Sequence, residues 1–422
     1  MKKQSISKTD ESSITWNNLE QWIRGHVQNF IQGILEEEVT DLLGRQKSVR
    51  RQPVDTSVGY RNGYGKPRRL TLSCGTITVK RPRVRECEER FVSLVLPLFK
   101  RKSRAVDHLL PELYLHGLAQ GDFELALQGL LGTAAPLSGS TIARLKEKWQ
   151  GELAQWQSRS LEEVEAVYLW MDGIYVKAGL EKDKAALLVV LAALSNGQKV
   201  VLAVVPGHRE STASWSAVLR DLKARGLRAP RLVIGDGHLG IWAGLRNVYP
   251  EVEEQRCWNH KILNVLNTLP TREQAAAKPL LCQIPFAPTQ REAEQRQAQF
   301  MRWCEQRGHM AAAQCLERDW ERLMTFYQFP QPHWQHLRTT NPVESPFAAV
   351  RLRTDAAKRF KKVANATAVI WKMLMVAEQT FRRVKHPELM TGVYRGMKCI
   401  DGRQEKTEVA VECSPNFGPA LC

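Results

Sequence analysis

The sequence lacks an apolar run of the roughly 20 residues that a membrane-spanning helix needs. Its first residues, MKKQSISKTDESS, also lack the apolar stretch of a signal peptide. The nine cysteines are an odd number scattered over 422 residues, unlike a disulfide framework. Acids are few beside bases, with 44 Asp and Glu against 61 Lys and Arg. We therefore expect a soluble, cytosolic protein with reduced cysteines and no membrane partner.

The positive charge is concentrated in two segments. Residues 45–104 hold 17 bases and four acids, and residues 351–362 hold six bases and one acid. Such clusters point to a polyanionic partner, most often a nucleic acid. Ribosomal or acidic-protein partners are the plainer alternatives.

The N-terminal part of the chain favours a helix followed by a basic hairpin. Residues 14–44 repeat apolar side chains at helical spacing and end in a glycine suited to a helix cap. Residues 45–90 contain two alternating runs, RRLTLSC and TITVKRPRV, which predict a hairpin. A solvated linker is the alternative. The candidate DNA contacts of the basic hairpin segment are Arg81, Arg83 and Arg85.

Residues 106–150 contain three helical patterns. The last two resemble a helix-turn-helix whose second helix enters the major groove. This second helix carries Arg144, Lys146 and Lys148 as candidate DNA contacts. A small helical bundle has the same spacing and stays open as an alternative.

From residue 164 the pattern changes to strands. Three apolar runs, VEAVYLWMD, DKAALLVVLAAL and QKVVLAVVP, are followed by alternating helices and short strands. The order βββαβαβα matches an RNase H-like layout with a mixed sheet. Residues 271–338 are helical and rich in Gln, Glu and Arg, which predicts an all-α insertion. The residues after 386 predict a weakly ordered tail.

Three carboxylates stand where this layout would bring them together. Asp172 closes the first apolar run, Asp236 lies between two glycines after a short strand, and Glu344 opens a helical pattern. Three hard-oxygen ligands favour Mg²⁺, and two such ions about 3.5–4 Å apart can promote phosphodiester cleavage and joining. Each acid also has a structural alternative, namely a turn for the two aspartates and a capping box after Asn341 for Glu344.

Other residues near these acids are candidates for supporting roles. Arg351 lies seven residues after Glu344, which places both on the same face of a continuous helix. Arg353 would extend this basic face toward DNA. A basic face that is only solvated is the alternative. Cys257 and His260 have the spacing of half a zinc site, but a second pair of ligands is missing.

The two histidines near the second aspartate have two interpretations. His238 and His260 either position phosphate or water, or serve in packing.

Five segments carry a family resemblance: GYRNGYGKPRRLTLSCGTITVKRPRVR, LWMDGIYVKAG, VIGDGHLGIWAGL, EEQRCWNHKILNVL and TTNPVESPFAAVRLRT. Over residues 36–402 the chain resembles the Mutator-type (IS256-like) transposases of bacterial insertion sequences. The resemblance implies that Asp172, Asp236 and Glu344 are the DDE triad, binding two Mg²⁺ ions, for which Mn²⁺ can substitute. Cys257 and His260 match the C-x2-H signature of the family.

Two further positions bear on the resemblance. Arg351 matches the family's basic residue seven places after the Glu. Asp355 departs from a region that is usually more uniformly basic.

The resulting expectation is a multidomain α/β protein with an RNase H-like catalytic core. Its parts are N-terminal helices with a basic hairpin (1–105), a helix-turn-helix-like module (106–155), the first part of the core (160–270), an all-α insertion (271–338), the final core helices (339–395) and a tail (396–422).

The implied activity is metal-dependent cleavage and strand transfer at the terminal inverted repeats of an insertion sequence. Its partners would be double-stranded DNA and at least one further copy of the chain, in the bacterial cytoplasm at the nucleoid. A structure-specific nuclease of RNase H type and a DNA-binding repressor with a silent core are the alternatives.

Overall fold

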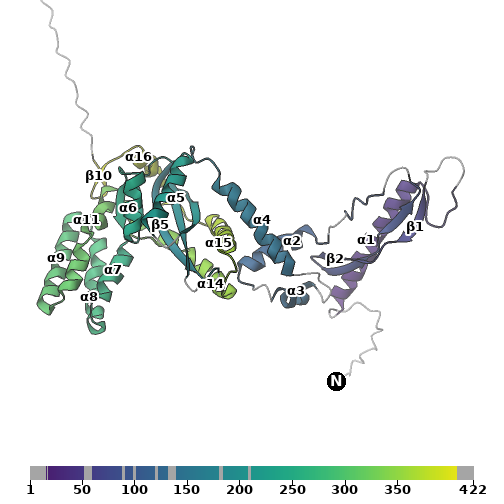
Figure 1. Ribbon diagram of the computed structural model, residues 1–422, viewed down its shortest axis with the longest axis horizontal. Coiled ribbons are helices and arrows are strands. Elements are labelled where there is room, and N and C mark those ends of the chain that lie inside the picture. Colours follow the sequence, from purple (N-terminus) through teal and green to yellow (C-terminus); the bar gives the residue numbers. More distant parts are fainter. Residues whose placement is uncertain are drawn as a thin grey trace, which may run out of the picture. The chain divides into compact units, whose positions relative to one another are not determined.

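The computed structural model describes residues 16, 18–51, 59–87, 91–97, 101–118, 122–131, 139–179, 184–207 and 211–405 (Figure 1). The chain divides into two compact units, Met1–Leu145 and Lys146–Cys422. None of the described helices is long and apolar enough to cross a lipid bilayer. The described cysteines are free thiols, namely Cys74, Cys87, Cys257, Cys282, Cys304, Cys315 and Cys399.

The N-terminal unit begins with a long helix packed on a basic hairpin. Helix α1 (Leu19–Leu43) ends at Gly44, which adopts the left-handed conformation predicted for the cap. Strands β2 (Arg68–Leu72) and β3 (Gly75–Val79) form an antiparallel hairpin. The flanking strands β1 (Tyr60–Tyr64) and β4 (Pro82–Arg85) pair with each other.

A small apolar core holds α1 on this hairpin. It consists of Leu35, Leu70, Ile77, Val79 and Leu96. The predicted hairpin is therefore confirmed, and the linker alternative does not apply to residues 59–87.

Three helices follow the hairpin: α2 (Arg104–Leu115), α3 (Phe123–Leu131) and α4 (Gly139–Gln157). The segment that would form the turn of the predicted helix-turn-helix, residues 132–138, lies outside the described residues. The motif therefore stays a prediction. The boundary between the two units falls within α4.

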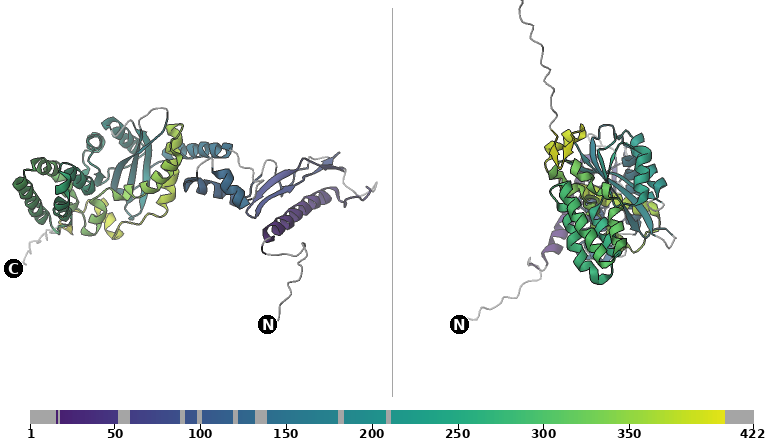
Figure 2. Two further views of the ribbon diagram at one scale, coloured as in Figure 1. Left: turned by 90° about the horizontal axis from the view of Figure 1, so that it is seen from below. Right: turned by 90° about the vertical axis from the view of Figure 1, so that its left-hand side faces the viewer.

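The second unit is built on a five-stranded mixed sheet in the order β7-β6-β5-β8-β9. Figure 2 shows this unit from two further sides. Its strands are β5 (Ala166–Val176), β6 (Ala185–Leu194), β7 (Lys199–Gly207), β8 (Leu232–Gly235) and β9 (Glu253–Arg256). Strands β5, β6 and β7 are antiparallel neighbours, whereas β8 and β9 run parallel to β5. The almost wholly buried, Val- and Leu-rich strands are typical of a sheet covered on both faces.

Helices α5 (Thr212–Ala224) and α6 (Leu239–Val248) cover one face of the sheet. Their buried side chains, among them Trp215, Leu219 and Trp242, form one apolar core with Leu169 and Met171 of β5. This core fixes the face on which each β5 side chain lies, because successive residues of a strand alternate.

The predicted all-α insertion consists of helices joined by turns, without a strand, over residues 271–338, all of which the structure describes. Helix α7 (Trp258–Asn267) leads into a bundle beside the sheet (Figure 1). The insertion contains α8 (Thr271–Gln283), α9 (Gln290–Arg307), α10 (Met310–Glu317), α11 (Trp320–Met324) and α12 (Trp334–Leu337), of which α8 and α10 pack on α7, and α9 packs on α8 and α10.

The chain then returns to the sheet through α13 (Asn341–Glu344), α14 (Phe347–Ala357) and α15 (Val363–Glu378). Helix α15 contacts β7.

The expectation of a weakly ordered tail is wrong for residues 387–404. They form α16 (Met390–Tyr394) and a short hairpin of β10 (Cys399–Ile400) and β11 (Arg403–Gln404). Backbone hydrogen bonds between Gly402 and the insertion residues Tyr327 and Gln331 hold this hairpin in place. Its stability comes from long-range contacts that its composition does not reveal.

Candidate active site

The two aspartates lie at equivalent register positions of neighbouring parallel strands, Asp172 within β5 and Asp236 directly after the end of β8. Met171 of β5 pairs with Gly235, the last residue of β8. Asp172 and Asp236 are the next residues after this pair, one in each segment. Strand β5 does not end at Asp172, as the sequence suggested, but continues to Val176 because β6 still pairs with it.

The side chain of Asp172 lies on the sheet face opposite α5 and α6. Tyr168 and Trp170 share this face by alternation, and both contact the end of the insertion. The Tyr168 hydroxyl lies 2.7 Å from Nδ1 of His333, and the Trp170 indole donates to the His336 carbonyl at 3.0 Å. The segment that leads into α13 therefore covers the same face as Asp172.

Local hydrogen bonds orient both aspartates. The carboxylate of Asp172, 8% exposed, accepts from its neighbour's backbone N–H at 2.8 Å. Asp236 accepts from the His238 N–H, also at 2.8 Å. Gly237, between Asp236 and His238, has a φ of +95°, and a Cβ on this residue would lie 2.5 Å from Nε of Arg256. This turn thus requires glycine for both backbone conformation and space.

Glu344 ends the short helix α13, which contacts β5 and β6. The residue before the helix is Thr340, not Asn341, so the capping box proposed from the sequence is not formed. The Glu344 carboxylate instead accepts a hydrogen bond from the Thr340 hydroxyl. Its side chain is 30% exposed.

Cys257 and His260 lie beside Glu344, at the start of α7. The Cys257 sulfur accepts from the Thr340 N–H at 3.3 Å, and the Thr340 hydroxyl lies 3.2 Å from it. Nδ1 of His260 lies 3.4 Å from the same hydroxyl and 3.8 Å from the Glu344 carboxylate. The C-x2-H pair and the third acid thus form one cluster.

Hydrogen bonding to Cys257 raises the pKa of His260 to about 9, against burial, which lowers it. The charges of Glu344 and Asp236 act in the same direction as Cys257. The imidazole is therefore a cation at neutral pH, within electrostatic reach of two of the three acids. His238 instead caps α6, where its Nδ1 accepts from the Gly240 N–H at 3.4 Å.

A buried ion cluster joins the insertion to this site. Asp319, between α10 and α11, forms ion pairs with Arg256 at the end of β9 and, at 3.1 Å, with Lys261 of α7. The exposed fractions of these three side chains are 7%, 10% and 1%. Arg256 also packs on Gly237, next to Asp236. The insertion thereby supports both the second acid and the start of α7.

The two arginines predicted to follow Glu344 along one basic face differ in exposure. Arg351 is exposed on α14, whereas Arg353 is only 1% exposed and so lies off the exposed face. Helix α13 ends at Glu344 and α14 begins at Phe347, with Ser345 and Pro346 between them. Pro346 has no N–H to continue the helical hydrogen bonds.

The hairpin arginines also differ. Arg83 and Arg85 are exposed, and Arg85 lies 3.8 Å from Glu86. Arg81 is half-buried and donates to the Phe91 carbonyl at 2.8 Å.

On α4, Arg144 is exposed and Lys146 is half-buried. Lys148 is also exposed and lies 3.6 Å from Glu152. Arg144 therefore keeps the exposure that a base contact needs.

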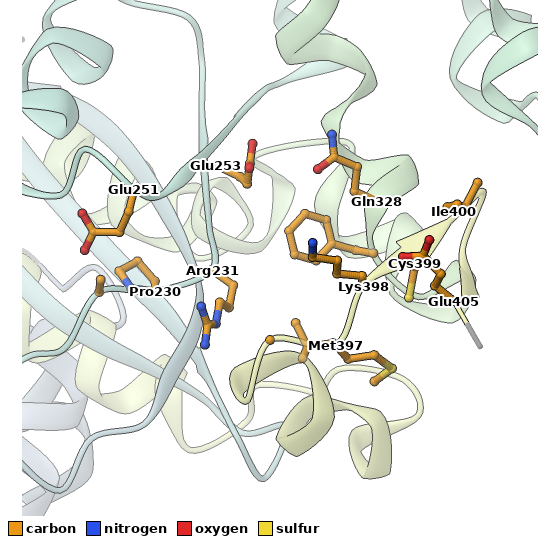
Figure 3. A pocket seen from close by; sticks show the side chains of 14 residues that line it. Pro230, Arg231, Glu251, Glu253, Gln328, Met397, Lys398, Cys399, Ile400 and Glu405 are labelled. Atoms are coloured by element: carbon orange, nitrogen blue, oxygen red, sulfur yellow. The ribbon is translucent and has the colours of Figure 1, made fainter. Parts of the chain in front are cut away.

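A separate cavity of about 510 Å³ lies at the opposite end of the parallel strands (Figure 3). It is lined by Arg231, which precedes β8, by Glu253, which opens β9, and by Lys398 and Cys399 near the C-terminal hairpin. It contains none of the three acids.

Sequence reasoning missed three residues of the site: Thr340, Arg256 and Asp319. Thr340 stands four residues before Glu344, a spacing that a helix N-terminus brings together. Arg256 and Asp319 carried no comparable signal, since their pairing spans 63 residues.

Comparison with known proteins agrees with the resemblance seen in the motifs. The chain is 41% identical over 315 residues to the transposase for insertion sequence element IS6120 of Mycolicibacterium smegmatis, covering 74% of this chain and 97% of that protein. It is 41% identical over 279 residues to the transposase for element IST2 of Acidithiobacillus ferrooxidans, covering 66% and 94%.

A more distant relative is the transposase for element IS256 in transposon Tn4001 of Staphylococcus aureus, 25% identical over 345 residues, or 81% of this chain and 86% of that protein. The family model described as "Transposase, Mutator family" matches residues 1–384. The chain therefore belongs to the Mutator family of transposases.

Proposed function

We propose that this chain is a DDE transposase in which Asp172, Asp236 and Glu344 bind Mg²⁺ for DNA strand cleavage and transfer. Membership of a transposase family implies an enzyme that cleaves and transfers DNA. The observation that carries the assignment to these acids is their placement. Asp172 and Asp236 follow the same register position on adjacent parallel strands, and the helix of Glu344 contacts β5 and β6.

The donor set fits a hard divalent cation. All three side chains offer carboxylate oxygens, the ligands that Mg²⁺ prefers, and Mn²⁺ accepts the same set. When bound, two such ions would activate a water or a DNA 3′-hydroxyl and stabilise the leaving oxygen. The chain's own part is to hold the carboxylates, through hydrogen bonds to one oxygen of each.

The strand arrangement supports an RNase H-like core. In chain order the sheet reads third, second, first, fourth, fifth, with only the second strand antiparallel to the rest. The first acid lies on the first strand and the second acid just after the fourth. The order of elements along the chain, βββαβαβα, is the one expected from the motifs.

The exposed bases support double-stranded DNA as the partner. Arg83, Arg85 and Arg144 in the N-terminal unit and Arg351 on α14 are exposed, as contacts to phosphates or bases require. We further propose that the active complex contains at least two copies, because cleavage at each element end requires a catalytic centre.

Amide variants of the acids test the proposal. Asp172→Asn, Asp236→Asn and Glu344→Gln should each abolish cleavage and joining of element ends while binding stays within a few-fold of wild type, since metal ligands and not phosphate contacts are lost. Glu317→Gln, an exposed acid on α10, is the matched control and should keep full activity.

The products distinguish the alternative functions. A transposase joins the 3′-ends of the element to target DNA, whereas a nuclease of RNase H type yields only cut strands. A silent repressor binds the ends without any metal-dependent turnover. Substantial strand transfer by Glu344→Gln would remove that residue from the metal site.

A further inference from the structure

Thr340 is the centre of the hydrogen-bond cluster at the third acid. It is fully buried, and its hydroxyl lies within hydrogen-bond distance of Cys257, His260 and Glu344. The three ligand-type atoms of these neighbours lie within 4.8 Å of one another, as in a site for a soft metal ion. The same three atoms surround the Thr340 hydroxyl, which links them through hydrogen-bond contacts.

The number of protons decides how this cluster is connected. A hydroxyl donates one hydrogen bond, and a carboxylate acceptor makes the strongest one. The Thr340 O–H therefore donates to the Glu344 carboxylate, and the Cys257 sulfur and Nδ1 of His260 lie 3.2 and 3.4 Å from the hydroxyl oxygen. The Cys257 sulfur accepts from the Thr340 backbone N–H.

Further hydrogen bonds anchor this segment to the start of α7. The Trp258 N–H donates to the Arg338 carbonyl at 2.9 Å, and the Asn259 amide donates to the Asn341 side chain at 3.1 Å. Together with the Cys257–Thr340 contact, these bonds connect three consecutive residues, the N-cap Cys257 and the first two residues of α7, to the segment just before Glu344. Thr340 is therefore fixed on the side of α7, and its hydroxyl is the link from this anchor to the carboxylate.

We propose that Thr340 is a positioning residue, whose hydroxyl holds the Glu344 carboxylate in the orientation that binds the divalent cation. The proposal rests on the proposed function of Glu344. Cys257 serves as the anchor of Thr340, which gives the C-x2-H pair a role in orienting the third acid. Loss of the hydroxyl releases the carboxylate into several rotamers, so cation binding has to order it again.

Three variants of the full-length chain test this role. Thr340→Val keeps the shape of the buried side chain and removes the hydroxyl, and Thr340→Ser keeps the hydroxyl. Thr339→Val changes the neighbouring threonine and is the matched control. Among the described contacts, the Thr339 hydroxyl accepts only from the Asn341 N–H.

Mn²⁺ binding without DNA, followed by electron paramagnetic resonance, is the first measurement, and the metal dependence of end cleavage is the second. Thr340→Val should need at least tenfold more Mn²⁺ in both, and cleavage should recover at saturating metal. Thr340→Ser should restore the wild-type requirement, and Thr339→Val should not change it. The melting temperature without metal reports any purely structural effect.

An unchanged or lowered metal requirement in Thr340→Val would overturn the positioning role, as would a loss of cleavage that excess metal does not restore in a folded protein. If the valine variant fails to fold, the serine variant decides, since a tenfold weaker Mn²⁺ affinity there also contradicts the proposal. Failure of the proposed function is recognised separately, because Glu344→Gln would then bind Mn²⁺ and cleave like wild type.

Discussion

Replacing Asp319 by Asn tests how the insertion supports the catalytic sheet. The change removes one charge but keeps the side-chain size, and Asn tolerates the left-handed backbone that this residue adopts at φ 77. It leaves Arg256 and Lys261 as buried cations without their shared carboxylate. Removal of one partner of a buried ion pair costs about 3–5 kcal/mol of folding free energy.

This loss is measurable as a fall in melting temperature. At about 2–4 °C per kcal/mol for a domain of this size, the second unit should melt roughly 6–20 °C lower. Differential scanning calorimetry at neutral pH measures the shift. Glu317→Gln should change stability by no more than about 0.5 kcal/mol, as an exposed control on the neighbouring helix.

The pH dependence of the same variant checks the cause. Burial alone would raise the pKa of Asp319, but Arg256, Lys261 and Arg322 together lower it below the ordinary value of 3.8. A depressed carboxyl pKa contributes stability that is complete above the unfolded value and is lost as the pH falls through the folded value. The difference in unfolding free energy between wild type and the Asp319→Asn variant should therefore be constant near neutral pH and should vanish in strong acid. A melting temperature within about 2 °C of wild type at neutral pH, roughly the effect of 1 kcal/mol, would refute the reasoning.

Further predictions concern the second acid and DNA binding. Gly237→Ala should abolish strand cleavage with little loss of end binding, because the alanine Cβ would lie 2.5 Å from the Arg256 guanidinium beside Asp236. Gel-shift assays measure end binding and cleavage assays measure activity, and full cleavage would contradict the prediction. Neutralising Arg83 and Arg85 together should lower the slope of log affinity against log salt by about two, at roughly 0.9 per phosphate contact. An unchanged slope would exclude phosphate contacts. Arg144→Ala should cost about 1–3 kcal/mol against the cognate end and little against random duplex in competition binding, whereas equal losses would indicate a phosphate contact.

Much of the fold was predictable because its signals are local. Apolar runs gave the strands β5, β6 and β7, and the capping Gly44 gave the end of α1. The hairpin β2–β3 followed from alternation. The C-terminal hairpin was missed because two-residue strands have no period, and contacts to residues 327 and 331 hold it in place.

The candidate site was predictable only in part. Motif order pointed to Asp172, Asp236 and Glu344, whose metal binding stays a prediction. The buried state of Arg353 was not visible, because an arginine among basic residues reads as part of a solvated face. Asp319 was missed because its partners Arg256 and Lys261 belong to other elements, brought near only by the folded insertion.

The order of the three acids along the chain has a consequence for synthesis. Roughly 100 residues, mostly the insertion, separate Asp236 from Glu344. At about 5–20 residues per second a ribosome needs on the order of 5–20 s to translate them. A nascent chain thus exposes its basic N-terminal unit first, then the strands with both aspartates, and only later the third acid. On the proposed assignment, a protein still attached to its ribosome can contact DNA before it is able to cut it.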